Sequence, residues 1–298
     1  MYLEHFGLHE YPFSLTPDTD FFFESASHRD ALNTLHAALR LGEGFNKVTA
    51  EIGLGKTLLC RLLLRELNDD FVTAYVPDPL LSPHSLRVAL ARELAVEPND
   101  GGSDEQLLRG IQQRLVSIAR SGRRTVLLID EAHQLPRDTL ESVRLLTNLE
   151  TEKSKLLQVV IIGQPELDRR LCEPGLRQLR QRIGFDCTLQ PLTVADTATY
   201  IEHRVTRAGA CAADLFAAAA TTRIFRASRG TPRLINMLCH KSLLAAFGNG
   251  ARQVTAAHAA RAVSDSSSAL GAGGRRWWPL RSFIPAHAAG RLNPGHTS

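Results

Sequence analysis

Residues 50–57 read AEIGLGKT, and this stretch decides the fold. It fits the phosphate-binding pattern Gly-x-x-x-x-Gly-Lys-Ser/Thr, except that Ala50 stands where the pattern has its first glycine. The stretch is therefore a working loop, a decayed loop or a chance match. Its surroundings argue against chance, because FNKVTA before it predicts a strand and KTLLCRLLLREL after it predicts a helix. A loop between a strand and a helix is the context that phosphate binding requires.

Each part of this loop has an expected role. Backbone N–H groups of residues 53–57 can face a phosphate at a helix N-terminus, and Gly53 and Gly55 allow its close approach. Lys56 is expected to reach the β- and γ-phosphates, and Thr57 to bind Mg²⁺. An alanine is acceptable at the exit of the strand if its backbone is extended, which predicts a permitted variant. The predicted nucleotide-binding residues of the loop are Ala50, Glu51, Ile52, Gly53, Leu54, Gly55, Lys56, Thr57 and Leu58.

A second motif, VLLIDEAH at residues 126–133, places two acids after a buried strand. The carboxyl end of a parallel strand would bring Asp130 and Glu131 beside the loop. Asp130 suits an Mg²⁺ contact, and Glu131 suits polarising an attacking water. Taken alone, the pair could equally be surface acids, but the loop upstream favours the catalytic interpretation. A helicase needs two sheet domains, and this chain predicts one, so the letters DEAH do not indicate that class.

The rest of the chain predicts an α/β domain followed by helices. Five apolar strand candidates separated by helices predict a parallel sheet covered on both faces. From Pro191 to residue 265 every periodic segment is helical. The predicted domains are a nucleotide-binding domain at 1–190, which includes the N-terminal segment 1–26, a helical domain at 191–265, and a disordered tail at 266–298 rich in Ser, Gly, Pro and Arg.

Charge and composition narrow the function classes. The formal net charge is +4, but the tail carries four arginines and no acids, which leaves 31 basic against 31 acidic residues elsewhere. A neutral body argues against nucleic acid as a partner. The five cysteines form no Cys-x-x-Cys pair, and no apolar run is long enough to predict a transmembrane segment. These features predict a cytoplasmic protein, with peripheral attachment at the inner membrane left open.

Several further motifs together resemble the AAA+ ATPases of the general secretion pathway protein A family. The likeness covers residues 1 to about 265, and its nearer branch is the MSHA pilus biogenesis proteins. Besides the loop and the acid pair, the motifs that carry it are MYLEHFGLHEYPFSLTPDTDFFF (1–23), LLTNLETEKSKLLQVVIIGQPELDRRL (145–171), LRQLRQRI (176–183) and SRGTPRLINMLC (228–239).

The resemblance implies a P-loop NTPase fold with a sheet of order 5-1-4-3-2, a helical lid, and binding and hydrolysis of Mg²⁺-ATP. It implies that Gln164 is the polar sensor of the γ-phosphate, with Asn148 a weaker candidate, and that Arg233 is the lid arginine that touches nucleotide. Arg180 and Arg182 would be arginine fingers for a neighbouring subunit, which implies a homo-oligomer. The residues themselves leave alternatives open: Gln164 could simply start a turn, and the arginine pair could be a solvated face.

The resemblance also leaves two points unsettled. Pro12 and Phe13 could pack along the adenine or serve in an ordinary core. Longer relatives continue into a membrane helix and a wall-binding domain, whereas the tail GGRRWWPLRSFIP has too few apolar residues to cross a bilayer. That difference favours the pilus branch.

The expected function is therefore an ATPase that supports assembly of a type IV (MSHA-like) pilus or a type II secretion machine. Its expected partners are inner-membrane assembly proteins of that machine. Two alternatives stay open: a DNA-associated ATPase of the transposition-helper kind, and a nucleotide-gated scaffold with little turnover.

Overall fold

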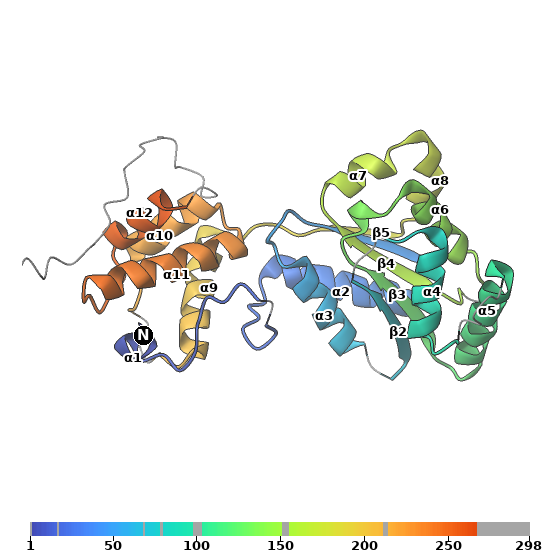
Figure 1. Ribbon diagram of the computed structural model, residues 1–298, viewed down its shortest axis with the longest axis horizontal. Helices are drawn as coiled ribbons and strands as arrows, with labels where there is room; N and C mark the ends of the chain where they lie inside the picture. Colours follow the sequence, from blue (N-terminus) through green and yellow to red (C-terminus); the bar gives the residue numbers. More distant parts are fainter. Residues whose placement is uncertain are drawn as a thin grey trace, which may run out of the picture.

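The computed structural model has two parts, a sheet flanked by helices and a separate group of helices (Figure 1). The tail predicted at 266–298 lies, beyond Ser266, outside the described residues. The structure describes residues 2–16, 18–67, 69–77, 80–97, 103–150, 155–210 and 214–266.

The sheet has five parallel strands. They are β1 (Phe45–Thr49), β2 (Phe71–Val76), β3 (Arg124–Ile129), β4 (Gln158–Gly163) and β5 (Phe185–Thr188). Their order is β2-β3-β4-β1-β5, which is the expected order 5-1-4-3-2 read from the other edge, so the predicted fold is confirmed. Because β1 and β3 both pair with β4, the carboxyl ends of these three strands lie together at one edge of the sheet.

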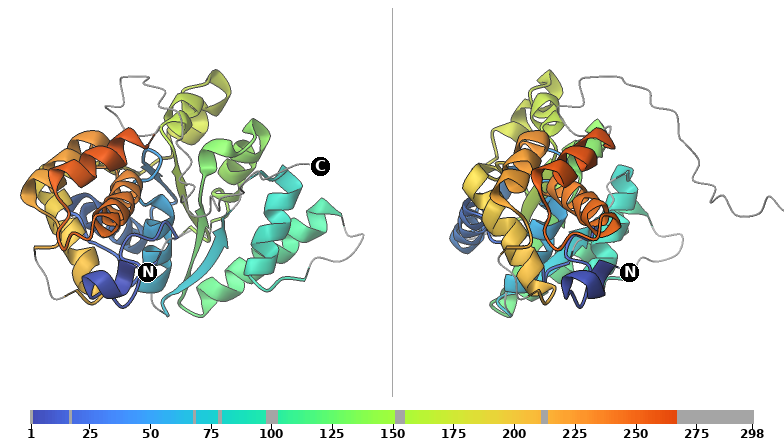
Figure 2. Two further views of the ribbon diagram at one scale, coloured as in Figure 1. Left: turned by 60° about the vertical axis from the view of Figure 1, so that its left-hand side comes forward. Right: turned by 90° about the vertical axis from the view of Figure 1, so that its left-hand side faces the viewer.

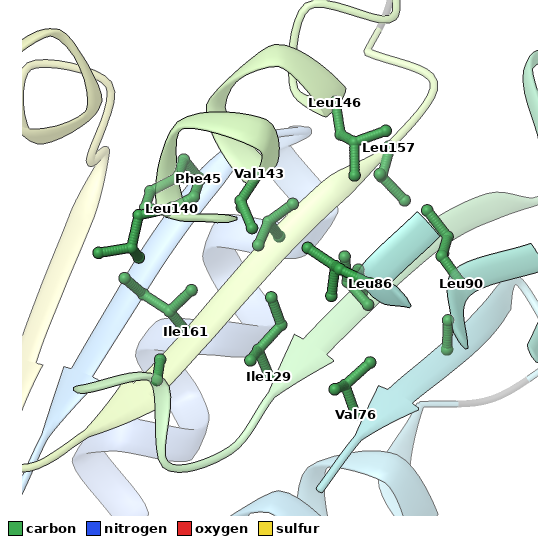
Figure 3. Close-up of a cluster of buried hydrophobic side chains, with 14 of the residues drawn as sticks. Phe45, Val76, Leu86, Leu90, Ile129, Leu140, Val143, Leu146, Leu157 and Ile161 are labelled. Carbon is green, nitrogen blue, oxygen red and sulfur yellow. The ribbon is translucent and has the colours of Figure 1, made fainter. Parts of the chain in front are cut away.

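Helices cover both faces of the sheet, as Figures 1 and 3 show. Side chains alternate along β3, with Leu127 and Ile129 in one core and Val126 and Leu128 in the other. This alternation explains why the strands read as continuous apolar runs. One face carries α2 (Ala26–Leu41) and α3 (Lys56–Glu66). The other face carries α4 (Pro83–Glu93), α5 (Asp104–Arg120), η1 (Ala132–Gln134), α6 (Arg137–Leu146), α7 (Glu166–Leu171), η2 (Pro174–Leu176) and α8 (Arg177–Arg180).

Local signals set the ends of several helices. Ser103 caps α5 in a capping box with Gln106, as the sequence predicts. The side chain of Ser25 accepts a hydrogen bond from the backbone N–H of His28 at the start of α2. That helix ends at Gly42, which has the left-handed backbone (φ 85°) typical of a glycine C-cap.

The second part consists of α9 (Val194–Arg207), α10 (Ala218–Ser228), α11 (Pro232–Gly248) and α12 (Ala256–Ser264), with α1 (Tyr2–Phe6) packed against them (Figure 2). The N-terminal segment 1–26 is expected to belong to the sheet domain, yet most of its aromatic residues pack on the helical part, and Phe22 packs on the sheet side. Tyr2, Phe6, Phe13 and Phe21 are buried in the core of the helical part. Phe13, only 2% exposed, therefore serves in this core and does not face a base. Such a contact between distant segments has no local sequence pattern.

Gly230 lies against the segment that connects the sheet part to the helical part. Its φ is +74°, and a Cβ built on it would lie 2.0 Å from the carbonyl oxygen of Leu192. The backbone N–H of Leu192 donates to the carbonyl of Gly230 at 2.9 Å. The segment that leads into α9 therefore packs directly against the glycine before α11.

We expect Gly230→Ala to lower the free energy of unfolding by roughly 2 kcal/mol or more, because the methyl group adds overlap to an unfavourable dihedral. Urea unfolding measures the change. Gly248→Ala is the matched control, since a Cβ there meets nothing within 4 Å in the same part of the chain. Equal stability of the two variants would contradict this account.

Candidate nucleotide-binding site

The first position of the loop accepts its alanine without strain. Ala50 is fully buried in the core beneath α2 and α3. Its backbone N–H donates to the carbonyl of Gly163 at 3.0 Å, which continues the hydrogen bonding between β1 and β4 by one residue. Its φ is not among the positive values found in the described residues. The curl of the loop begins after this position, so a methyl group fits here.

The two loop glycines stand where side chains do not fit. Gly53 has φ +83° and Gly55 has φ +92°. A Cβ on Gly53 would lie 2.8 Å from the Cβ of Arg233, and one on Gly55 would lie 3.0 Å from Nε2 of His28. At these two positions the loop therefore presents backbone alone, at the N-terminus of α3.

Lys56 lies at the centre of this loop. Its Nζ donates to the carbonyls of Ala50 at 3.1 Å and Glu51 at 3.4 Å. The side chain also lines the adjacent cavity. An ammonium group beside a row of backbone N–H groups makes this end of the cavity suited to an anion.

The acid pair that follows β3 meets the loop directly. The hydroxyl of Thr57 donates to Oδ2 of Asp130 at 2.9 Å. Oδ1 of Asp130 accepts the backbone N–H of Glu131 at 2.8 Å. Burial raises the pKa of Asp130, and these two hydrogen bonds oppose that rise. The pairing brings two hard oxygen groups to one point beside the anion-binding loop.

A hydroxyl and a carboxylate in this position fit Mg²⁺. Magnesium typically takes one or two protein oxygen ligands and completes its shell with water and substrate phosphate. The described residues hold no cluster of three or more His, Cys, Asp or Glu side chains, so they do not offer an all-protein metal cage. Thr57 and Asp130 are the residues that would hold the ion.

Glu131 stands in a rare backbone conformation and points into the same cavity. Its φ is +48° and its side chain is 30% exposed. Oε2 lies 3.4 Å from Nε2 of Gln164 and 3.3 Å from Nδ1 of His133. A non-glycine residue with positive φ is uncommon and is often found at functional sites.

The cavity has a volume of about 360 Å³ and lies between the two parts of the chain. Leu15 and Ile52 line it while remaining 57% and 59% exposed. Large exposed apolar side chains beside a polar phosphate loop offer a surface for a planar base. The polar and charged lining side chains are Ser14, Thr16, Asp18, Lys56, Thr57, Glu131, Gln164, Tyr200, Arg204, Arg233 and Asn236.

Three cavity-lining residues on the lid side, Tyr200, Arg204 and Asn236, are not among the residues predicted from the sequence. Arg204 is only 7% exposed and donates to the hydroxyl of Tyr200 at 3.0 Å, and that hydroxyl donates to Asn236 at 2.8 Å. Arg204 also donates to the carbonyl of Pro12, and its guanidinium lies 4.9 Å from the ring centre of Phe21. No described carboxylate lies within 4.0 Å of Arg204. The spacing of Tyr200 and Arg204, one helical turn apart, was the available signal.

The structure separates the predicted residues into two groups. Gln164 and Arg233 line the cavity, as do Ile52, Gly53, Gly55, Lys56, Thr57, Leu58 and Glu131. The loop residues Ala50, Glu51 and Leu54 are not among its lining residues. Asp130 does not line it either and meets the site through its hydrogen bond with Thr57.

Asn148, Arg180 and Arg182 lie elsewhere. Asn148 follows the end of α6 and is exposed, so it does not serve as a sensor in this cavity. Arg182 donates to the hydroxyl of Thr147 at 3.1 Å, and Arg180 to the sulfur of Cys172 at 3.4 Å. Both arginines are exposed and do not line this cavity. A finger role for them requires the cavity of another subunit and stays a prediction.

The arrangement of strands, loop and lid is the fold of P-loop AAA+ proteins. The AAA domain family matches residues 39–171. Cdc6p from Pyrobaculum aerophilum superposes with a TM-score of 0.63 at 20% identity, over 82% of this chain and 67% of that chain. The Aeropyrum pernix ORC2 protein, solved with ADPNP and ADP, gives 0.61 at 15% identity, over 84% of this chain and 72% of that chain.

One curated relative is much closer in sequence. The chain is 41% identical over 254 residues to general secretion pathway protein A of Aeromonas hydrophila. The match covers 85% of this chain and 46% of that protein, so the chain spans about half of its relative's length. The chain is thus an AAA-domain homologue of that secretion protein. Within the described part of the chain, no helix is long and apolar enough to cross a membrane.

Ala50→Gly tests the first position of the loop. We expect ATP affinity to change by less than about 1.4 kcal/mol, or tenfold, because the alanine is already accommodated. Titration with a fluorescent ATP analogue measures the change. A gain of a hundredfold or more would mean that the natural loop is impaired.

Proposed function

We propose that the chain binds Mg²⁺-ATP and hydrolyses it. The observation that carries this proposal is the hydrogen bond between Thr57 and Asp130, with Lys56 and Glu131 lining the same cavity. It joins the phosphate-binding loop to the acid pair, the two elements that phosphoryl transfer needs together. The ADPNP and ADP complexes of the Aeropyrum pernix neighbour support a nucleotide as the ligand of this fold.

The residues divide the work of hydrolysis. Lys56 and the loop N–H groups bind the phosphates, and Arg233 contacts the nucleotide from the lid. Mg²⁺, when bound, would neutralise charge that develops on the phosphates. Glu131 orients a water and accepts its proton while the water oxygen bonds to the γ-phosphorus. The bond from that phosphorus to the β–γ bridging oxygen breaks, and Gln164 contacts the γ-phosphate.

The proposed cellular role is energy supply for assembly of a type IV (MSHA-like) pilus or a type II secretion machine. The support is the identity with general secretion pathway protein A over most of this chain. Inner-membrane assembly proteins of such a machine are the proposed partners. The proposed location is the cytoplasm, with attachment at the face of the inner membrane. Capture of partners by a Glu131→Gln variant held with ATP would identify them.

Glu131→Gln should bind ATP normally and turn it over at least ~10²-fold more slowly, because the group that accepts the water's proton is lost. Phosphate release and nucleotide titration measure the two effects. Lys56→Ala is the companion variant, and it should lose ATP binding because it lacks the mobile cation among the phosphate donors. Unchanged affinity in Lys56→Ala would refute the site, and negligible turnover of the wild-type chain would favour a nucleotide-gated scaffold.

The exposed arginines predict hydrolysis between subunits. A neighbour's Arg180 or Arg182 would balance charge on the transferring phosphoryl group, an effect of ~10³ to 10⁵ in rate in related systems. Specific activity should therefore rise with protein concentration. Arg182→Ala and Arg180→Ala should lose activity while they keep ATP binding. Mixing Arg182→Ala with Lys56→Ala should restore some turnover, because one subunit supplies an intact site and the other an intact arginine.

Two results would contradict an arginine finger. One is specific activity that stays flat from dilute to concentrated protein. The other is a failure of the two inactive variants to complement each other at any mixing ratio. Both arginines would then be solvated surface residues of a monomeric enzyme.

A further inference from the structure

Few groups hold the carboxylate of Glu131, although the proposed function requires this carboxylate to orient a water molecule. Its backbone is fixed, since its N–H donates to Asp130 and its carbonyl accepts from Gln134 N–H at 2.9 Å. The position of its side chain depends on contacts with neighbouring side chains. Among the described residues, the side-chain contacts of its carboxylate are His133 and Gln164.

His133 is the better anchored of these two neighbours. It lies in η1, and its carbonyl accepts a hydrogen bond from the guanidinium of Arg170. Its backbone packs on the end of β4, where a Cβ on Gly163 would lie 3.2 Å from the His133 nitrogen. Its side chain is 13% exposed. The backbone of His133 is thus fixed on two sides, which limits where its imidazole can lie.

One ring nitrogen of His133 faces two possible partners. Nδ1 lies 3.3 Å from Oε2 of Glu131 and 3.5 Å from the backbone N–H of Gln164. In this structure Nδ1 accepts the N–H of Gln164, and its contact with Glu131 is an ion-pair distance. A proton on Nδ1 would let it donate to the carboxylate instead. Burial lowers the pKa of His133, so the neutral ring is favoured, and its tautomer decides which contact is made.

In the proposed function Gln164 also contacts the γ-phosphate, and this contact would move its amide away from Glu131. Its amide now donates to Glu131 at 3.4 Å, yet the proposed function turns that amide towards the γ-phosphate. Glu131 would then keep a single side-chain donor among the contacts described above. A carboxylate that must hold one orientation during catalysis needs such a donor, because a small misplacement of a catalytic group costs rate.

The geometry points to His133 as the positioning residue that holds the Glu131 carboxylate, through its Nδ1–H, when Gln164 engages the phosphate. His133 does not touch the nucleotide and transfers no proton to it. This inference rests on the proposed hydrolysis and deepens it. The competing explanation is that His133 only fills space between η1 and β4.

An isosteric pair of variants separates the two explanations. His133→Asn places an amide nitrogen where Nδ1 lies, whereas His133→Leu has the same branched shape and no donor. We expect His133→Leu to lower kcat by about 10²-fold with KM and ATP affinity nearly unchanged, and His133→Asn to keep kcat within about tenfold of wild type. Wild-type kcat in His133→Leu, or equal losses in both variants, would overturn the role.

The same substitution in a Glu131→Gln background gives a second, independent readout. If His133 acts through Glu131, then His133→Leu should slow the Glu131→Gln enzyme by less than about threefold further. A further loss as large as in the wild-type background would mean that His133 acts on something else. A general loss of stability caused by His133→Leu would slow both backgrounds equally, so this comparison separates it from an effect exerted through Glu131.

His36 provides a matched control elsewhere in the chain. Its Nε2 contacts Oε2 of Glu66 at 2.8 Å, a histidine–glutamate pair between α2 and α3. His36→Leu should leave kcat unchanged. The same variants distinguish a failure of the proposed role of Glu131 from a failure of the role of His133. Wild-type turnover in Glu131→Gln would refute the proposed function of Glu131, whereas a slow Glu131→Gln with a fully active His133→Leu would refute the role of His133 alone.

Discussion

The candidate site depends on the parallel pairing of β1, β3 and β4. Parallel strands end at the same edge, so the loop after β1, the acids after β3 and Gln164 after β4 meet without any one segment reaching far. The hydrogen bond from Thr57 to Asp130 is the closest expression of this constraint. It is possible only because β4 alone separates the two strands whose ends it joins.

Burial on both faces keeps these strand ends in register. A shift of one residue along β3 would move Leu127 and Ile129 from one core into the other and displace Asp130 from Thr57. The apolar residues of the strand thus fix where its acids lie. This explains how a pair of acids can follow directly on the apolar run at residues 126–129 of β3.

The sequence was informative where function depends on local chemistry. The loop, the acid pair and the helical character of residues 191–265 follow from spacing and residue type, whereas the lid assignment and the strand order followed from the family resemblance. The placement of Phe13 on the lid, the buried Arg204 network and the contact between His133 and Glu131 did not follow. The first two join segments whose nearness is set by tertiary packing, which no periodicity records. The third is local, and it follows a left-handed backbone at Glu131 (φ +48°) that no sequence pattern signals. The exception is the pair Tyr200 and Arg204, whose helical spacing was visible.

The lid contacts the phosphate loop at Gly53. The backbone N–H of Arg233 donates to the carbonyl of Gly53 at 3.3 Å, and the missing side chain of Gly53 lets α11 approach this closely. A shift of the Gly53 carbonyl would therefore alter a hydrogen bond at the N-terminus of α11. The same helix carries Asn236, which contacts Tyr200 and, through its amide, the carbonyl of Ser14. Hydrogen bonds thus connect the phosphate loop with α11, and α11 with α9 and the N-terminal segment. The buried N-terminal aromatics join this segment to the lid, because separating the two would expose the shared core.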